Sequence, residues 1–93
     1  MAEEACRIDV WLWRARLFKT RTLAAGVAEA GRIRLMRQGE TVRADKASRT
    51  VRIGDELVFA HAGRLFAIRV EALGWRRGPP SEARGLYASL GDS

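Results

Sequence analysis

The chain has 93 residues, of which 47% are hydrophobic and 30% charged, a balance that fits one small globular domain and excludes a disordered tail. Seventeen Lys and Arg residues outnumber eleven Asp and Glu residues, and the net charge of +6 favours a polyanionic partner, nucleic acid or an anionic membrane surface. A single cysteine excludes an internal disulfide, and neither a signal-peptide pattern nor an apolar run of ~18 residues is found, so a cytoplasmic protein is expected.

Two short helices are expected at the start of the chain. Asp9 is placed to cap the first, because its carboxylate can accept a hydrogen bond from a first-turn amide, so this helix should span residues 10–17. Residues 18–20 then turn the chain, and Thr20 should cap a second helix that begins at Arg21. Gly31 should end it, and a core-facing stripe at helical spacing consists of Leu23, Ala24, Val27 and Ala28.

Alternating apolar and polar residues predict a sheet after the second helix. The first strand, residues 32–36, places Ile33 and Leu35 on its buried face, and Gln38-Gly39 is a turn before a short strand at 41–43. Most of 37–50 should be loop. Further strands are expected at 57–61 and 65–73, preceded by a short alternating segment at 51–53 and joined by a reversal at Ala62-Gly63.

The end of the chain predicts a break and a third helix. Gly and Pro interrupt residues 74–80, and Ser81 can cap a helix whose first turn carries Glu82. Helical spacing gives that helix an apolar face made of Ala83, Leu86, Tyr87 and Leu90.

No residue pattern typical of catalysis or metal binding is present in the sequence. His61 is the only histidine, no Cys/His cluster has metal-ligand spacing, and no glycine-rich phosphate loop precedes a Lys-Ser/Thr pair. Asp55 and Glu56 are adjacent and fit solvated turn residues. The sequence therefore predicts a protein that is not an enzyme, with no catalytic residues, no metal and no cofactor.

Basic residues gather around the turn between the two predicted helices. Arg16, Lys19 and Arg21 flank the start of a helix, where backbone amides and the helix dipole add to their charge. Arg32 and Arg34 would continue this patch on the exposed face of the next strand. Such a surface suits phosphates along a folded RNA, whereas the alternative is an ordinary solvated charged face.

Aromatic residues lie among these cations and have two possible roles. Trp13 and Phe18 are expected in the core, because a small domain needs large apolar groups, while Trp11 fits the core or a base-stacking role equally. Trp75 either packs beneath the last helix or extends the basic patch.

Four short motifs resemble the S4-type RNA-binding domain, or αL motif. They are Arg7-Ile8-Asp9-x-x-Leu12, Thr20-Arg21-Thr22-x-Ala24, Glu29-Ala30-Gly31-Arg32-Ile33 and Gly54-Asp55-Glu56-Leu57. More narrowly, residues 11–21 and 76–87 resemble the heat-shock protein 15 family of ribosome-associated proteins. The resemblance covers residues 7–87. The chain departs from the family pattern at residues 35–39, which replace a Val-Asn-Gly hairpin, at 45–48, which lack the customary proline, and in having no long basic tail.

The resemblance implies an α+β fold with two N-terminal helices packed on a small, mostly antiparallel sheet, plus a short C-terminal helix. Residues 7–73 would form the S4-type domain, and 74–93 a break and a helix packed on the same domain. The family's RNA-facing surface is carried over to Arg7, Arg16, Lys19, Thr20, Arg21 and Arg32, with Arg14 and Arg34 as additions at its margin.

The implied function is binding of structured RNA, such as rRNA and tRNA, and of DNA less specifically. In the family this extends to large ribosomal subunits that still carry a nascent chain, with a subunit-recycling role after heat stress. A monomer is expected. Two alternatives stay open: an accessory module that acts with a separate RNA-modifying enzyme, and a basic module that binds an acidic protein.

Overall fold

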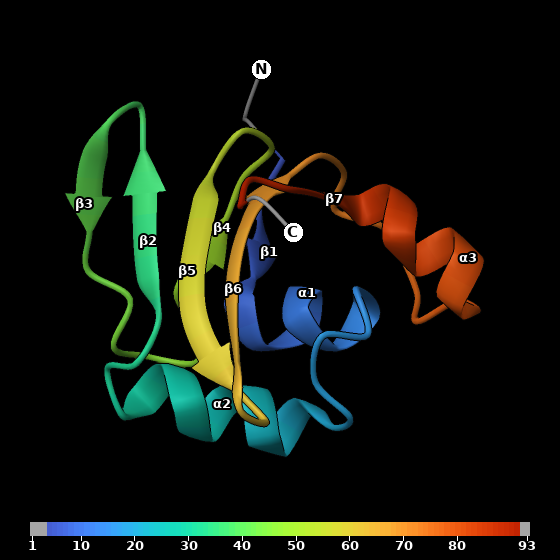
Figure 1. Ribbon diagram of the computed structural model, residues 1–93, viewed down its shortest axis with the longest axis horizontal. Coiled ribbons are helices and arrows are strands. Elements are labelled where there is room, and N and C mark those ends of the chain that lie inside the picture. Colours follow the sequence, from blue (N-terminus) through green and yellow to red (C-terminus); the bar gives the residue numbers. More distant parts are fainter. Residues whose placement is uncertain (1–3, 92–93) are drawn as a thin grey trace.

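A five-stranded antiparallel sheet is covered on one face by two helices in the computed structural model, which describes residues 4–91 (Figure 1). The strands of this sheet lie in the order β3-β2-β5-β6-β7, and β1 and β4 form a separate two-stranded ladder. The elements in chain order are β1 (Cys6–Arg7), α1 (Ile8–Arg14), α2 (Arg21–Glu29), β2 (Arg34–Arg37), β3 (Glu40–Val42), β4 (Thr50–Val51), β5 (Glu56–His61), β6 (Arg64–Val70), α3 (Pro80–Ala83), a 3₁₀ turn (Arg84–Leu86) and β7 (Tyr87–Ser89).

The core lies between the helices and the sheet. Leu35 of β2 faces Leu57 of β5, which faces Ile68 of β6, so alternation directs these three side chains to the same buried face. The predicted α+β class, with two N-terminal helices on an antiparallel sheet and a short C-terminal helix, is confirmed. Other large side chains that are fully enclosed are Trp11, Phe18, Phe59, Ile8, Leu12, Val51 and Val70.

Helix α1 begins two residues earlier than predicted, so Asp9 lies inside the first turn and is not the N-cap residue. Its carboxylate nevertheless accepts a hydrogen bond from a first-turn amide, as predicted: the Val10 amide donates to Asp9 Oδ1 at 2.7 Å. Arg7 is the N-cap residue and makes no side-chain cap bond. The amides of Ile8 and Asp9 instead donate to the carbonyls of Arg49 and Ala47, at 2.7 and 3.5 Å. Backbone from the segment before β4 therefore satisfies amides that a side chain would otherwise cap.

The two helices end in the same hydrogen-bonding pattern, a Schellman motif. In α1 the Leu17 amide donates to the Leu12 carbonyl at 3.1 Å, and Arg16 takes the left-handed position with φ of 58°. In α2 the left-handed residue is Gly31, with φ of 72°, as predicted. Because α1 ends at Arg14, three residues before the predicted end, the connection to α2 is longer than expected.

Helix α2 has the predicted bounds and cap. The Leu23 amide donates to Thr20 Oγ1 at 3.0 Å, and the helix runs from Arg21. Ala24 and Ala28 are buried as expected, but Leu23 is 47% exposed, so its assignment to the core face is wrong. Helix α2 packs mainly against α1, and the small alanines Ala24 and Ala28 lie in the core while Leu23 stays at its margin.

Both predicted hairpin turns are present. Gln38-Gly39 and Ala62-Gly63 have positive φ at both residues, 53° and 82° in the first and 53° and 78° in the second. This is the type I′ pattern, which matches the twist of paired strands.

Asp55 differs from the prediction of a solvated turn residue. It is 2% exposed, and its carboxylate accepts hydrogen bonds from the Arg37 guanidinium at 2.8 and 2.9 Å and from the Arg52 amide at 2.8 Å. The carboxylate thus joins the 52–55 turn to strand β2.

The C-terminal segment departs most from the prediction. Helix α3 is a single turn with Pro79 as its N-cap residue and no side-chain cap, so the predicted cap at Ser81 is wrong. Tyr87 lies on strand β7, which pairs with β6, and not on a helix. Strand β6 ends at Val70, because the amides of Glu71 and Ala72 turn away to the Leu86 carbonyl. The domain boundary at residues 73–74 stays a prediction.

Within residues 4–91 no helix has the length and apolar character needed to cross a bilayer.

Candidate nucleic-acid interface

The elbow, defined here as residues 15–21, joins α1 to α2 and presents a basic surface on a buried anchor. Leu17 and Phe18 are 9% and 1% exposed, and the Phe18 ring lies 4.1 Å from the His61 ring, centroid to centroid. Lys19 and Arg21, by contrast, are exposed. The apolar residues therefore hold the elbow against the sheet while its cations point to solvent.

The cations that flank the start of α2 have no acidic partner. Neither the Lys19 nor the Arg21 side chain makes a hydrogen bond or ion pair with any group in residues 4–91, and the first turn of α2 contains no acidic residue. The positive end of the helix dipole adds to these charges, which makes this surface suited to an anion. Thr20 is also exposed, but its hydroxyl is engaged as the helix cap.

Arg16 is exposed but is partly engaged within the fold. Its Nε donates to the carbonyl of Gly78 at 2.7 Å, which ties the elbow to the C-terminal segment. The terminal nitrogens of the guanidinium make no hydrogen bond within residues 4–91, so they stay available to a ligand.

Arg7 and Arg14 are engaged with other groups of the protein. Arg7 forms a two-bond pair with the Asp9 carboxylate at 3.0 and 3.1 Å, and this hydrogen bonding raises the pKa of Arg7 above its ordinary value. Arg14 is half-buried and donates from Nη1 to the Gly74 carbonyl at 3.0 Å and to Cys6 Sγ at 3.6 Å. Asp9 and Arg21 line one shallow depression, which connects the Arg7 pair to the start of α2.

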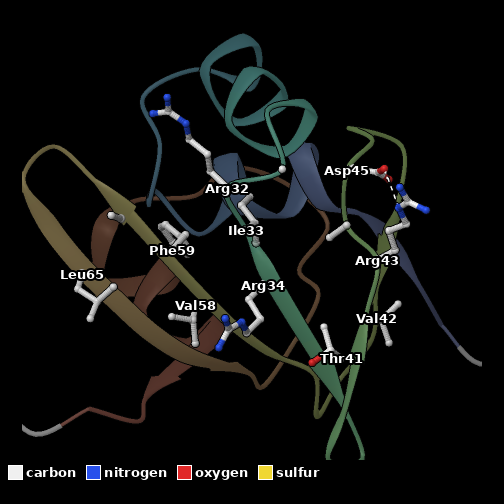
Figure 2. A pocket seen from close by; sticks show the side chains of 13 residues that line it. Arg32, Ile33, Arg34, Thr41, Val42, Arg43, Asp45, Val58, Phe59 and Leu65 are labelled. Carbon is white, nitrogen blue, oxygen red and sulfur yellow. Dashed lines mark hydrogen bonds and ion pairs between the residues drawn. The ribbon is translucent and has the colours of Figure 1, made fainter.

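Arg32 and Arg34 lie at the opposite end of α2 from the elbow, and the nine residues of the helix span about 13 Å. Both are exposed, and they line a groove with an apolar floor that includes Val58 and Leu65 (Figure 2). Arg43, paired with Asp45 at 2.9 Å, forms part of its other wall. The eight predicted residues therefore divide between the two ends of α2 and do not form one cluster.

The C-terminal segment brings further residues next to the elbow, which the sequence offered only as one of two alternatives for Trp75. Arg77 Nε donates to the Trp13 carbonyl at 3.0 Å, and its guanidinium lies 5.7 Å from the centroid of the Trp13 ring. Trp75 is 78% exposed, so packing beneath the last helix is wrong for it. The adjacent Trp75-Arg76-Arg77 in a Gly- and Pro-rich break was the only signal in the sequence.

The remaining aromatic residues are placed as follows. Trp11 is fully buried, and its Nε1 donates to the Ala72 carbonyl at 2.8 Å. Of its two possible roles, core residue or base-stacking surface, Trp11 therefore has the first. Phe18 is in the core as predicted, and Trp13 is half-buried beneath Arg77. In the part of the chain that the structure describes, no three His, Cys, Asp or Glu side chains are grouped to hold a metal ion.

Comparison with known proteins gives a consistent result. No family model matches the chain. It is 40% identical over 88 residues to the heat shock protein 15 homolog of Haemophilus influenzae and 33% identical over 87 residues to heat shock protein 15 of Escherichia coli strain K12. The alignments cover 94% of this chain but only 63% and 62% of those proteins, so the chain spans less than two thirds of their length.

A solved structure resembles the whole fold. It is the trimeric structure of Vibrio cholerae heat shock protein 15, which has a TM-score of 0.80 and 34% sequence identity to this chain. The match covers 94% of this chain and 83% of that one. The chain therefore belongs to the heat shock protein 15 family, whose members carry an S4-type domain.

Proposed function

We propose that this protein binds structured RNA through the elbow and associates with the large ribosomal subunit in a heat-shock or subunit-recycling role. The observation that carries the proposal is the pair Lys19 and Arg21, exposed beside the N-terminus of α2 without an acidic partner in residues 4–91. Membership of a heat shock protein family supports the cellular role.

Recognition on this proposal is passive and involves no chemical step. Lys19, Arg21 and the terminal nitrogens of Arg16 pair with phosphates, and amides in the first turn of α2 add hydrogen bonds. The shape of the folded RNA supplies selectivity more than base contacts do, because phosphate contacts carry no sequence information. DNA binds more weakly than RNA, because its phosphate backbone has a different geometry from that of the folded RNA that the elbow fits.

One chain is sufficient for this binding mode, because every residue of the elbow belongs to a single polypeptide. We propose that the protein binds RNA as a monomer, although the Vibrio cholerae relative is described as trimeric. Light scattering after gel filtration, with and without RNA, measures the mass of the binding species.

The test compares two double variants that remove the same charge. Lys19→Ala/Arg21→Ala removes the elbow cations, whereas Lys46→Ala/Arg69→Ala removes one lysine and one arginine that are exposed elsewhere. We expect the elbow variant to lose about tenfold or more in affinity for a ribosomal RNA fragment, and the control variant to lose much less. Both should unfold at nearly the wild-type temperature.

Sucrose-gradient profiles of tagged wild type and both variants extend the test to the ribosome. Wild type and control should migrate with free large subunits, and the elbow variant should stay at the top of the gradient. An equal loss in both variants would show that net charge, not the elbow, determines binding. Partners that survive ribonuclease digestion of a pull-down would favour a protein-interaction module.

A further inference from the structure

The loop of residues 74–78 is fastened to the C-terminal end of α1 by three side-chain bonds to backbone carbonyls. Arg14 holds the Gly74 carbonyl at 3.0 Å, Arg16 holds that of Gly78 at 2.7 Å, and Arg77 donates to the carbonyl of Trp13 at 3.0 Å. Trp75 lies between the first two attachment points. Its backbone is therefore fixed beside the elbow, where Figure 1 also shows the segment leading into α3 next to α1.

The indole of Trp75 is held in an exposed position. It is 78% exposed, although burial is the usual state of so large an apolar group. The Arg76 guanidinium lies 5.2 Å from the centroid of its ring, a cation–π distance. Arg76 is in turn bonded to the Glu82 carboxylate at 2.8 and 3.3 Å. The ring thus has one face against a fixed cation and the other open to solvent.

Gly78 lies directly against the Glu82 carboxylate that holds Arg76. A Cβ at residue 78 would lie 2.6 Å from Cδ of Glu82, too close for the carboxylate to keep its place. With glycine at this position, Glu82 reaches Arg76 without being displaced. The series Gly78, Glu82, Arg76 and Trp75 therefore forms a supported platform rather than a loose surface residue.

We propose that Trp75, supported by Arg76, is a platform on which an unpaired base of the bound RNA stacks. The proposal rests on the proposed function, because the phosphates held by the elbow bring the RNA to this site. Aromatic side chains stack on splayed bases of loops and bulges, and loss of one such contact lowers the affinity about tenfold.

RNA is favoured over an acidic protein as the ligand because the elements next to the ring supply the chemistry of a nucleotide. Arg16, Lys19 and Arg21 are continuous with the loop and suit phosphates, while the flat indole suits the face of a base. A base on the open face would also be attracted by the polarised ring, with no further apolar surface needed.

The test measures binding of two RNAs to the full chain: a hairpin with an unpaired loop and a blunt duplex of matched length. Trp75→Ala should weaken binding of the hairpin about tenfold and leave the duplex nearly unchanged. Trp75→Phe should retain most of the affinity, because a ring remains, and Trp75→Leu should not. Ile53→Ala, which removes another exposed apolar side chain, 59% exposed and outside the groove of Arg32 and Arg34, is the control and should change neither.

A second variant tests the support of the ring. Glu82→Gln removes the charge that holds Arg76, and we expect it to weaken hairpin binding a few-fold while leaving the fold intact. Recovery of full binding by Trp75→Leu would replace stacking by simple apolar contact and overturn the proposal.

The outcomes separate this proposal from the proposed function. If Trp75→Ala binds the hairpin like wild type while Lys19→Ala/Arg21→Ala does not, the platform is wrong and the elbow stands. If neither variant loses affinity for any RNA, the proposed function fails and the platform with it. Loss by Trp75→Ala of a partner that survives ribonuclease would assign the ring to a protein and overturn the proposal.

Discussion

Arg16 combines two demands that conflict in a single residue. Its position at the end of α1 requires φ of 58°, which suits glycine, but its side chain holds Gly78 and presents charge at the elbow. The conformational cost of keeping a non-glycine residue there is about 1 kcal/mol. That an arginine occupies the position indicates that its guanidinium has a use.

The strain at Arg16 predicts an inverted order of stability for two variants. Arg16→Ala and Arg16→Gly both lose the Nε hydrogen bond, but glycine also relieves the left-handed backbone. We expect the glycine variant to be the more stable by about 1 kcal/mol in urea unfolding, with equal loss of RNA affinity in both. A more stable alanine variant would mean that the backbone at this residue is not strained.

Cys6 should react slowly with thiol reagents. Burial raises the pKa of its thiol, against a smaller opposing effect of Arg14, so at a given pH less thiolate is present than in an exposed cysteine. We expect alkylation by iodoacetamide at pH 8 to be slower in the folded protein than in urea. The rate should rise as the pH increases through the raised pKa. Equal rates in the two states would contradict the assignment.

Helix α2 positions the proposed phosphate site, and its N-cap residue determines how rigidly the first-turn amides are held. Thr20→Ala removes the acceptor of the Leu23 amide and should cost about 1 kcal/mol of stability. It should also weaken RNA binding, because a frayed first turn no longer fixes its amides. Thr20→Ser keeps the hydroxyl and is the matched control, which should be near wild type in both urea unfolding and RNA titration.

The elements that were predictable from sequence are those whose signals are local. Thr20 and Gly31 determine the two ends of α2 by local interactions, and the residues of the two hairpin turns predict the hairpins. The start of α1 was not predictable, because its amides bond to carbonyls about 40 residues later. Tyr87 joins a strand instead of a helix because β6 offers it an unpaired edge.

The candidate site follows the same rule. Exposure of Lys19 and Arg21 could be expected from their place at a helix start. The bonds of Arg14, Arg16 and Arg77 could not, since each joins residues at least 60 positions apart in the chain. Those bonds hold residues 74–78 beside the elbow, so that both segments contribute to one surface.

The molecule as a whole carries exposed cations at both ends of α2, with the elbow at one end and Arg32 and Arg34 at the other. A short hairpin can contact the elbow alone, whereas a large folded RNA can follow the helix and reach both. Engagement of about four to six phosphates gives a slope of log affinity against log salt of roughly −3 to −5.

This geometry predicts that the salt dependence changes with the size of the RNA. For a large ribosomal fragment, Arg32→Ala/Arg34→Ala should make the slope shallower by about 1.5, because two phosphate contacts are lost at roughly 0.7–0.9 each. For a short hairpin the same variant should leave the slope unchanged, while Lys19→Ala/Arg21→Ala reduces it for both RNAs. Titrations by fluorescence anisotropy over a series of salt concentrations measure the slope for wild type and both variants on each RNA. If Arg32 and Arg34 affect the hairpin as strongly as the large fragment, the RNA does not follow α2 from the elbow, and the groove that these arginines line is then a contact of its own.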